Sequence, residues 1–272
     1  MIKAQRYAVI GHPVAHSKSP QIHKLFAKQI GGEIEYEAID VKKDKLEECI
    51  KVFLEHGGRG LNITLPHKQN VLVYLDQVST RAKIAGAVNT ITKADNGKLM
   101  GDNTDGVGLI TDLKHNLGVK IKGSTILILG AGGAARGILS PLFEESPKEM
   151  AIANRTISKA EKIMIDFKKQ GNLKVYEFEQ LKEKTFDIII NATSVGIKEN
   201  SAPFPNEIIR PGAVCYDLSY SLTDTPFISW AKNLGCKNTY SGLGMLIEQA
   251  AESFMLWHGV RPNTKNILSK LS

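Results

Sequence analysis

The stretch ILILGAGGAAR at residues 126–136 decides the fold class of the chain. Its four leading apolar residues predict a strand, and Gly130, Gly132 and Ala135 follow in the G-x-G-x-x-A spacing of dinucleotide-binding turns. Gly130 permits the tight turn, Gly132 lets the backbone approach a pyrophosphate, and Ala135 lets the helix pack closely on the strand. Because a helix-length segment and a second strand follow, we predict a dinucleotide site whose phosphates meet the N-terminus of that helix.

The end of the next predicted strand indicates which dinucleotide binds. Sites for NAD usually carry Asp or Glu about 20 residues after the first glycine, where it contacts the ribose 2′-hydroxyl. Here Asn154, 24 positions after Gly130, takes that place, and Arg155, Thr156 and Lys159 follow it. A guanidinium fork can hold a 2′-phosphate and Lys159 adds a second cation, so we expect NADP(H) rather than NAD(H). The alternative is that both cations are solvated on a surface helix.

Apolar runs alternate with helix-length amphipathic stretches in two successive series. Such alternation is typical of βαβ units, so we predict the α/β class with two open, mostly parallel sheets. Strands of the first series are expected at residues 7–10, 35–39, 60–63 and 87–92, with helices at 22–29, 45–56 and 71–75 and a hairpin turn at Asn96-Gly97. Strands of the second series are expected at residues 125–129, 150–153, 174–178, 187–191, 214–217 and 237–240.

Local patterns predict three further helices. Residues 106–117 would join the two series as an amphipathic helix, and residues 245–257 would form a long apolar-rich helix whose placement the periodicity leaves open. Ser158 and Glu161 have capping-box spacing, which predicts a helix that begins there and runs to about Gln170.

Length and composition narrow the function classes. The 272 residues correspond to about 1.8 domains at roughly 150 residues each, and the net charge of +7 suits anionic ligands. The chain lacks a dense basic run with interleaved aromatic residues, which argues against nucleic acid as the partner. No apolar run approaches the roughly 18 residues of a membrane span, and the N-terminus lacks a signal-peptide core, so we expect a cytoplasmic protein without a membrane partner. Cys49, Cys215 and Cys236 have no CxxC spacing, which favours free thiols.

Polar residues gather directly after the strands of the first series, where open α/β sheets bind ligands. They lie in GHPVAHSKSP (11–20), NITLPHK (62–68), AVNT (87–90) and DNTDG (102–106). Each Ser, Thr or Asn taken alone is typical of a turn or a cap, but their shared position favours a substrate site. His12, His16 and His67 flank these segments without the spacing of a metal site, so no metal is expected.

The order of these motifs resembles that of the shikimate dehydrogenase family over nearly the whole chain. The matching motifs are HSKSP (16–20), NITLPHK (62–68), GAVNT (86–90), NTDG (103–106), GAGGA (130–134), NRT (154–156), NATS (191–194) and GLGMLIEQA (242–250). The resemblance implies reversible NADP-linked interconversion of shikimate and 3-dehydroshikimate, a step toward chorismate and the aromatic amino acids. It also implies a discontinuous substrate-binding domain, residues 1–105 with 241–272, and an inserted NADP-binding Rossmann domain, residues 106–240.

The same resemblance implies roles for individual residues. Lys68 and Asp105 would form the catalytic pair, and Ser17 and Ser19 would hold the substrate carboxylate. The ring hydroxyls would meet Asn62, Thr64, Asn89, Asp105 and Gln249. Tyr220 would lie around the ribose and nicotinamide and also bind the substrate. The cofactor would be held by Gly130, Ala131, Gly132, Gly133, Ala134, Asn154, Arg155, Thr156, Lys159, Thr193, Leu218, Gly242 and Met245.

The expected chemistry needs a cation at one atom. Hydride transfer to a ring ketone leaves negative charge on oxygen, so the site requires a positioned proton donor there. We expect Lys68 to supply it, with Asp105 orienting the ammonium and binding an adjacent hydroxyl. Three alternatives stay open: a quinate/shikimate dehydrogenase of broader specificity, a non-catalytic NADP(H)-sensing protein, and an enzyme of the methylenetetrahydrofolate dehydrogenase type. The partner would be a small-molecule substrate, and the chain a monomer or a homodimer.

Overall fold

The computed structural model describes residues 5–193, 204–221 and 223–271 of the chain. The fold consists of two compact units: unit 1 is Met1–Leu109 with Leu246–Ser272, and unit 2 is Ile110–Met245. Unit 2 is therefore an insertion in the sequence of unit 1. Ser194, the last residue of the NATS motif, lies outside the described residues.

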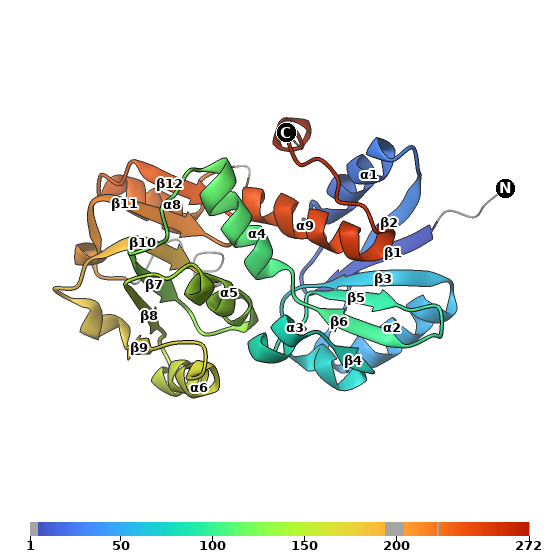
Figure 1. Cartoon of the computed structure of the whole chain (residues 1–272), viewed down its shortest axis with the longest axis horizontal. Coiled ribbons are helices and arrows are strands. Elements are labelled where there is room, and N and C mark those ends of the chain that lie inside the picture. The colour runs from blue at the N-terminus through green and yellow to red at the C-terminus, as the bar shows by residue number, and fades with distance from the viewer. Residues whose placement is uncertain (1–4, 194–203, 222, 272) are drawn as a thin grey trace. The chain divides into compact units, whose positions relative to one another are not determined.

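Unit 1 contains a six-stranded sheet in the order β2-β1-β3-β5-β6-β4 (Figure 1). Its strands are β1 (Gln5–Gly11), β2 (Ile34–Asp40), β3 (Gly58–Ile63), β4 (Gln77–Val78), β5 (Thr90–Lys93) and β6 (Leu99–Asp102). Strand β1 is parallel to β2 and β3, whereas β5 is antiparallel to both β3 and β6. The hairpin predicted at Asn96-Gly97 is confirmed, because β5 and β6 pair on either side of it.

Helix α9 (Leu243–His258) packs on the sheet of unit 1 through its C-terminal part. Trp257 donates its indole N–H to the Ile91 carbonyl at 3.0 Å. A Cβ at Gly60 would stand 2.5 Å from the Trp257 indole nitrogen, so this approach requires glycine. The other helices of unit 1 are α1 (Ser19–Gln29), α2 (Leu46–Glu55), α3 (Thr80–Ala85) and α4 (Asp105–Thr111), the last of which runs on into unit 2.

Unit 2 contains a sheet in the order β12-β11-β10-β7-β8-β9, in which all described neighbours are parallel. Its strands are β7 (Thr125–Leu129), β8 (Glu149–Ala153), β9 (Leu173–Tyr176), β10 (Phe186–Asn191), β11 (Ile209–Asp217) and β12 (Asn238–Ser241), and its helices α5 (Gly133–Glu144), α6 (Ile157–Phe167) and α8 (Pro226–Asn233). This strand order is that of the doubly wound dinucleotide-binding fold.

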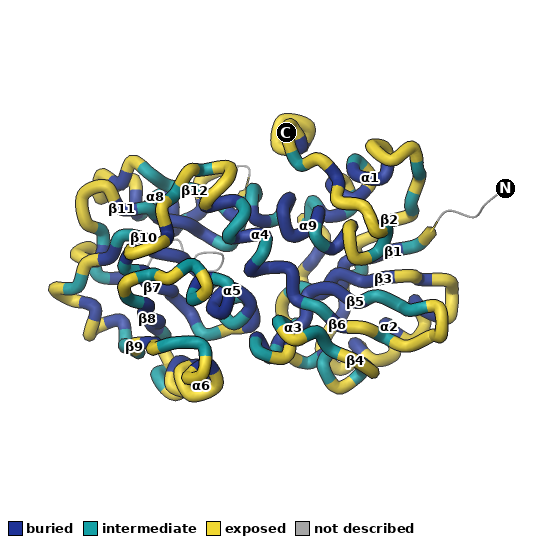
Figure 2. The backbone as a smooth tube through the Cα atoms, in the orientation of Figure 1, coloured by how far each residue is buried: buried dark blue, intermediate teal, exposed yellow. Residues whose placement is uncertain are grey.

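The central strands of the unit 2 sheet are apolar because the parallel sheet is covered on both faces. Residues 126–129 of β7 are fully buried, as expected for a parallel strand covered on both faces. Figure 2 shows the central strands of each sheet buried, whereas α6 is largely exposed. The prediction of two mostly parallel α/β sheets is confirmed.

The predicted Ser158–Glu161 capping box is wrong. Helix α6 begins at Ile157, so Ser158 already lies inside the first turn and its hydroxyl is past the capping position. Thr156 takes the N-cap place without a side-chain cap hydrogen bond, and the helix ends at Phe167 rather than near Gln170.

Other boundaries also differ from the prediction. The helix expected at 71–75 is a short 3-10 turn, Asn70–Tyr74. The strand expected at 87–92 begins only at Thr90, because the Val88 N–H donates to the Lys68 carbonyl instead of extending a strand pair. The joining helix ends as a π-helical turn over Asp112–Asn116. The short elements α3, α8 and β4 are not predicted at all.

His23 on α1 is a fully buried histidine within the aromatic core of unit 1. Its ring stacks on Tyr36 with centroids 4.5 Å apart, and neither ring nitrogen has a hydrogen-bond partner among the described residues. Burial and the neighbouring His258 lower the pKa of His23 to about 3, against an opposing effect of Asn62. The folded protein therefore holds this imidazole neutral.

We expect stability to fall in mild acid because of His23. Unfolded His23 takes up a proton near pH 6.5 and the folded residue only near pH 3, so the free energy of unfolding decreases as the pH falls between these values. Between pH 6.5 and pH 5 this loss should be about 2 kcal/mol by urea denaturation. His23→Leu should remove it, whereas His115→Leu, at an exposed position, should retain it. An unchanged pH slope in His23→Leu would contradict the assignment.

Candidate active site

Lys68, which is largely buried, and Asp105, which is buried, form an ion pair in unit 1. Lys68 follows the turn after β3, and Asp105 is the first residue of α4, close behind β6. The Lys68 Nζ donates to Asp105 Oδ2 at 2.5 Å, and the two side chains are 11% and 5% exposed. Removing both charges from water costs free energy that their attraction and further hydrogen bonds must offset, whereas an apolar pair would carry no such cost. The retained charges therefore point to a chemical role.

Asn89 completes the surroundings of Asp105. Its Nδ2 donates to Asp105 Oδ1 at 2.9 Å, to Thr104 Oγ1 at 2.8 Å and to Gln249 Oε1 at 3.1 Å. Its Oδ1 accepts the backbone N–H of Thr104 at 2.8 Å, so both ends of the amide are fixed. One oxygen of Asp105 is thus held by Lys68 and the other by Asn89. This arrangement leaves the carboxylate a single orientation.

A second group of polar side chains packs against this network. Asn62 donates to the Asn89 carbonyl at 3.2 Å and to Ser253 Oγ at 3.1 Å, and Tyr36 donates its hydroxyl to Asn62 Oδ1 at 2.7 Å. Sequence patterns single out neither Tyr36 nor Ser253. Ser253 lies four residues after Gln249, so helical spacing along α9 could have identified it, whereas no local signal marks Tyr36.

The predicted carboxylate-binding serines lie between β1 and α1. Ser19 is the first residue of α1 and is almost fully buried, and its backbone N–H donates to Ser17 Oγ at 3.2 Å. Thr64 directly follows β3, and its N–H donates to the Ile10 carbonyl at 2.9 Å. All three residues are at the carboxyl ends of neighbouring parallel strands, where open α/β sheets bind ligands. Within the described residues, none of them belongs to the Asp105 hydrogen-bond network.

The glycine-rich turn of unit 2 lies between β7 and α5. Gly130 has a φ of +104°, and a Cβ there would stand 2.9 Å from the Ala192 carbonyl oxygen, so glycine is required. Gly132 is the N-cap of α5, and nothing lies within 4 Å of the place a Cβ would take. The open backbone at a helix N-terminus fits an anionic phosphate. The other predicted residues of this turn are Ala131, Gly133 and Ala134.

The segment after β8 carries two exposed cations. The Asn154 N–H donates to the Tyr176 carbonyl at 3.2 Å, and its side-chain Nδ2 donates to the Thr156 carbonyl at 2.8 Å, which closes a turn before α6. Arg155, Thr156 and Lys159 are exposed, and among the described residues neither cation has an ion-pair partner. With the neutral Asn154 in the place of a carboxylate, this turn fits a 2′-phosphate.

Asn191 and Asp217 organise the ends of β10 and β11. Asn191 donates to Asp217 Oδ1 at 3.1 Å and accepts the N–H and the hydroxyl of Thr193 at 3.1 and 2.7 Å. Its carbonyl accepts the Leu218 N–H at 2.9 Å, and a Cβ at Gly242 would collide with the Leu218 carbonyl. Burial raises the pKa of Asp217 despite its hydrogen bonds. The structure thus brings three predicted cofactor residues, Thr193, Leu218 and Gly242, into one part of unit 2.

Met245 and Tyr220 also belong to unit 2. The Met245 N–H donates to the Tyr216 hydroxyl at 3.2 Å, and that hydroxyl donates to Asp112 at 2.6 Å. Burial raises the pKa of Tyr216 well above its ordinary value, so the phenol stays protonated. Tyr220 is half-buried beyond the end of β11, in a different unit from the other predicted substrate residues.

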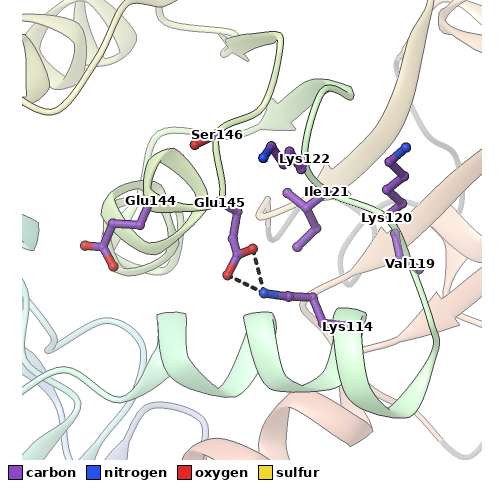
Figure 3. A pocket seen from close by; sticks show the side chains of 8 residues that line it. All are labelled: Lys114, Val119, Lys120, Ile121, Lys122, Glu144, Glu145 and Ser146. Atoms are coloured by element: carbon purple, nitrogen blue, oxygen red, sulfur yellow. Dashed lines mark hydrogen bonds and ion pairs between the residues drawn. The ribbon is translucent and has the colours of Figure 1, made fainter.

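Two surface cavities of unit 2 are not the dinucleotide site. One, of about 430 Å³, contains the side chains of Lys114 and Glu145, which pair at 2.7 Å (Figure 3). The other, of about 590 Å³, is lined by residues at the amino ends of β7, β10 and β12, among them Thr125, Ile188 and Asn238. Nucleotides bind such sheets at the carboxyl ends of the strands, so both cavities are at the wrong edge.

The histidines near the site have other partners. His67 Nε2 bonds the Val41 carbonyl at 2.6 Å, and His12 Nδ1 lies 2.6 Å from Asp40. In the described part of the chain, no three His, Cys, Asp or Glu side chains form a group that could hold a metal ion. Among the helices that the structure describes, none has the length and apolar character to cross a membrane.

Three family models match the chain. A model described as the shikimate dehydrogenase substrate binding domain matches residues 9–91, and one described as shikimate / quinate 5-dehydrogenase matches residues 112–198. A third, the shikimate 5′-dehydrogenase C-terminal domain, matches residues 242–271.

Relatives of similar length align along the whole chain. The shikimate dehydrogenase (NADP(+)) of Methylococcus capsulatus is 47% identical over 271 residues, which are 100% of this chain and 97% of the relative. That of Aeromonas salmonicida is 49% identical over 98% of this chain and 97% of the relative. The structure of shikimate 5-dehydrogenase from Thermus thermophilus in complex with NADP(H) and shikimate has a TM-score of 0.87 and 36% identity, and the match covers 98% of both chains.

Gly130→Ala should destabilise unit 2, because alanine is strained at a φ of +104° and its Cβ would meet the Ala192 carbonyl. We expect the free energy of unfolding in urea to fall by about 1–3 kcal/mol. Gly132→Ala is the matched control, since its φ of −95° suits other residues and nothing lies within 4 Å of the new Cβ. Equal stability of the two variants would contradict the proposed geometry of the turn.

Proposed function

The chain belongs to the shikimate dehydrogenase family, and on this premise we propose that it catalyses the reversible NADPH-dependent reduction of 3-dehydroshikimate to shikimate. The carrying observation is the Lys68–Asp105 ion pair of unit 1, whose carboxylate is buried, in a chain whose unit 2 has a glycine turn and two exposed cations after β8. The relatives named as NADP(+) enzymes and the complex with NADP(H) and shikimate support this assignment. A proton donor and a dinucleotide site are the two parts that nicotinamide-linked ketone reduction requires.

Lys68 is the proton donor in the direction of reduction. NADPH, when bound, supplies a hydride to C3 of the substrate. The Lys68 ammonium stabilises the negative charge that develops on the C3 oxygen and then gives that oxygen a proton. Asp105 keeps the ammonium oriented through the 2.5 Å contact, while Asn89 holds the other carboxylate oxygen. In the direction of oxidation, the neutral amine of Lys68 accepts the proton of the C3 hydroxyl.

The other polar side chains of unit 1 bind the substrate. The hydroxyls of Ser17 and Ser19 hold the carboxylate at the start of α1. The donors and acceptors for the ring hydroxyls are Asn62, Thr64, Asn89, Asp105 and Gln249. Because the amides of Asn89 and Gln249 are bonded to each other at 3.1 Å, their orientations are set before the substrate arrives. The assignment of Tyr220 to the substrate stays a prediction from the family resemblance.

The cofactor binds to unit 2. The Gly130–Ala134 turn at the N-terminus of α5 would hold its pyrophosphate, because the helix N-terminus favours negative charge. Arg155 and Lys159, with Asn154 and Thr156, hold the 2′-phosphate. Thr193, Leu218, Gly242 and Met245 would hold the ribose and the nicotinamide. The cytoplasmic location and the monomeric or homodimeric state stay predictions.

The test of the function is the rise of nicotinamide absorbance when shikimate and NADP⁺ are added to the purified protein. We expect turnover with this pair and little with quinate or with NAD⁺. Comparable turnover of shikimate and quinate would favour the enzyme of broader specificity. Tight NADP(H) binding without turnover would favour the sensing protein and contradict the proposal.

Lys68→Ala should reduce kcat much more than it raises KM for shikimate, because the ammonium acts on charge that develops in the transition state. We expect kcat to fall by about 10²- to 10⁴-fold and KM to change by less than about threefold. Steady-state kinetics with a melting curve for each protein measures both quantities. A raised KM with an unchanged kcat would instead assign Lys68 to substrate binding.

Arg155→Ser should remove much of the preference for NADP⁺ over NAD⁺, because the guanidinium bonds a phosphate that NAD⁺ lacks. We expect kcat/KM for NADP⁺ to fall by about 10- to 100-fold and that for NAD⁺ to change by less than about threefold. Lys162→Ser, an exposed lysine farther along α6, is the control and should leave both values unchanged. Equal losses with both cofactors would contradict the assignment of Arg155.

A further inference from the structure

Arg81 on α3 connects two segments that carry the proposed active site. Its Nε and Nη2 donate to the two carboxylate oxygens of Asp102 at 2.7 and 2.8 Å, and its Nη1 donates to Glu252 Oε1 at 3.1 Å. Asp102 is the last residue of β6, and Glu252 lies on α9. One guanidinium therefore ties the end of β6 to α9. Its three donors have fixed directions, so it sets orientation as well as distance.

The Asp102 carboxylate is held from several sides. Its Oδ1 also accepts the Ser79 hydroxyl at 2.6 Å and the Asn103 N–H at 2.7 Å. Burial acts to raise the pKa of Asp102, but the hydrogen bonds from Arg81 and Ser79 outweigh it and hold the pKa below its ordinary value. Asp102 is therefore an anion whose partners fix the backbone at the point where the chain turns toward Asp105.

Hydrogen bonds continue without a break from Asp102 to Asp105. The Asn103 side chain donates to the Ala87 carbonyl at 2.9 Å and accepts the Asp105 N–H at 3.1 Å. The next residue, Thr104, is bonded to Asn89. A displacement of Asp102 is therefore passed to Asp105 through two residues that have little freedom of their own.

The α9 end of the connection meets the same network. Glu252 is adjacent to Ser253 and three residues after Gln249, and both of these side chains bond to the group around Asn89. Arg261 also bonds Glu252, at 2.7 Å, and its second described partner, Glu248 at 3.0 Å, is on α9 as well. Arg81 and Arg261 thus share one carboxylate, but within the described residues only Arg81 connects it to β6.

We propose that Arg81 is a positioning residue, which fixes Asp105 and through it the Lys68 ammonium by tying Asp102 to α9. The inference rests on the proposed function, because it assigns Arg81 to the geometry of that reaction. Misplacement of a reacting group by about 1 Å can cost about 10²-fold in rate, so a tether three residues away has a measurable effect.

The experiment compares Arg81→Ala with Arg261→Ala in shikimate oxidation by the full-length protein. Arg261 is the matched control, since the two arginines are 31% and 35% exposed and both bond Glu252. Both variants should melt at similarly lower temperatures. Of the two variants, only Arg81→Ala should lower kcat, by about tenfold or more. Its KM for NADP⁺ should stay within about twofold of the wild-type value. Arg81→Lys, which keeps one charged contact, should recover part of the loss.

A second arm separates positioning from general loss of stability. In the Asp105→Asn background, Arg81→Ala should lower kcat by less than about twofold, because the group that it positions is already removed. A tenfold loss in that background, or equal kcat values for the Arg81→Ala and Arg261→Ala enzymes, would overturn the inference. If Arg81→Ala does not fold, Arg81→Gln replaces it with the same expectations. Absence of wild-type turnover would overturn the proposed function, whereas wild-type turnover with an unaffected Arg81→Ala enzyme would overturn the inference alone.

Discussion

The buried carboxylate of Asp105 is the group around which unit 1 is built. A buried charge needs a counter-charge and hydrogen bonds to both oxygens, and Lys68 and Asn89 supply them. These residues come from three places in the sequence, and the mixed sheet is what brings them together. Because β5 runs antiparallel to β3 and β6, its start lies beside the ends of both strands. An all-parallel order would place Asn89 at the opposite edge from Lys68 and Asp105.

The charged residues of the proposed cofactor site in unit 2 are exposed, unlike Asp105 in unit 1. Its glycine turn presents backbone rather than side chains, and the cations after β8 are exposed and have no described ion-pair partner. Exposed cations suit a ligand that carries several negative charges and is taken from water. A buried pair suits a proton transfer at one fixed atom, because the low local dielectric strengthens the interaction. The two kinds of site thus match the two tasks of the proposed reaction.

The sequence was most informative where function depends on local spacing. The G-x-G-x-x-A turn, the Asn154-Arg155-Thr156 segment and most strand positions are encoded within a dozen neighbouring residues. Contacts between distant residues were not predictable in this way. Tyr36 supports Asn62 from β2, and Gly60 accommodates Trp257 from nearly 200 residues away, and neither has a local signature. The failed capping box at Ser158 shows the converse, since its spacing is correct but the N-cap of the helix is Thr156, two residues earlier.

The central claim is that Lys68 and Asp105 act as one catalytic unit, and the kcat of the Lys68→Ala/Asp105→Asn double variant tests it most directly. Residues that act as a unit give strongly non-additive losses. The account predicts that the double variant turns over shikimate within about threefold of the slower single variant. If the double variant instead lowers kcat by the product of the two separate fold-losses, the residues act independently, which would contradict the account.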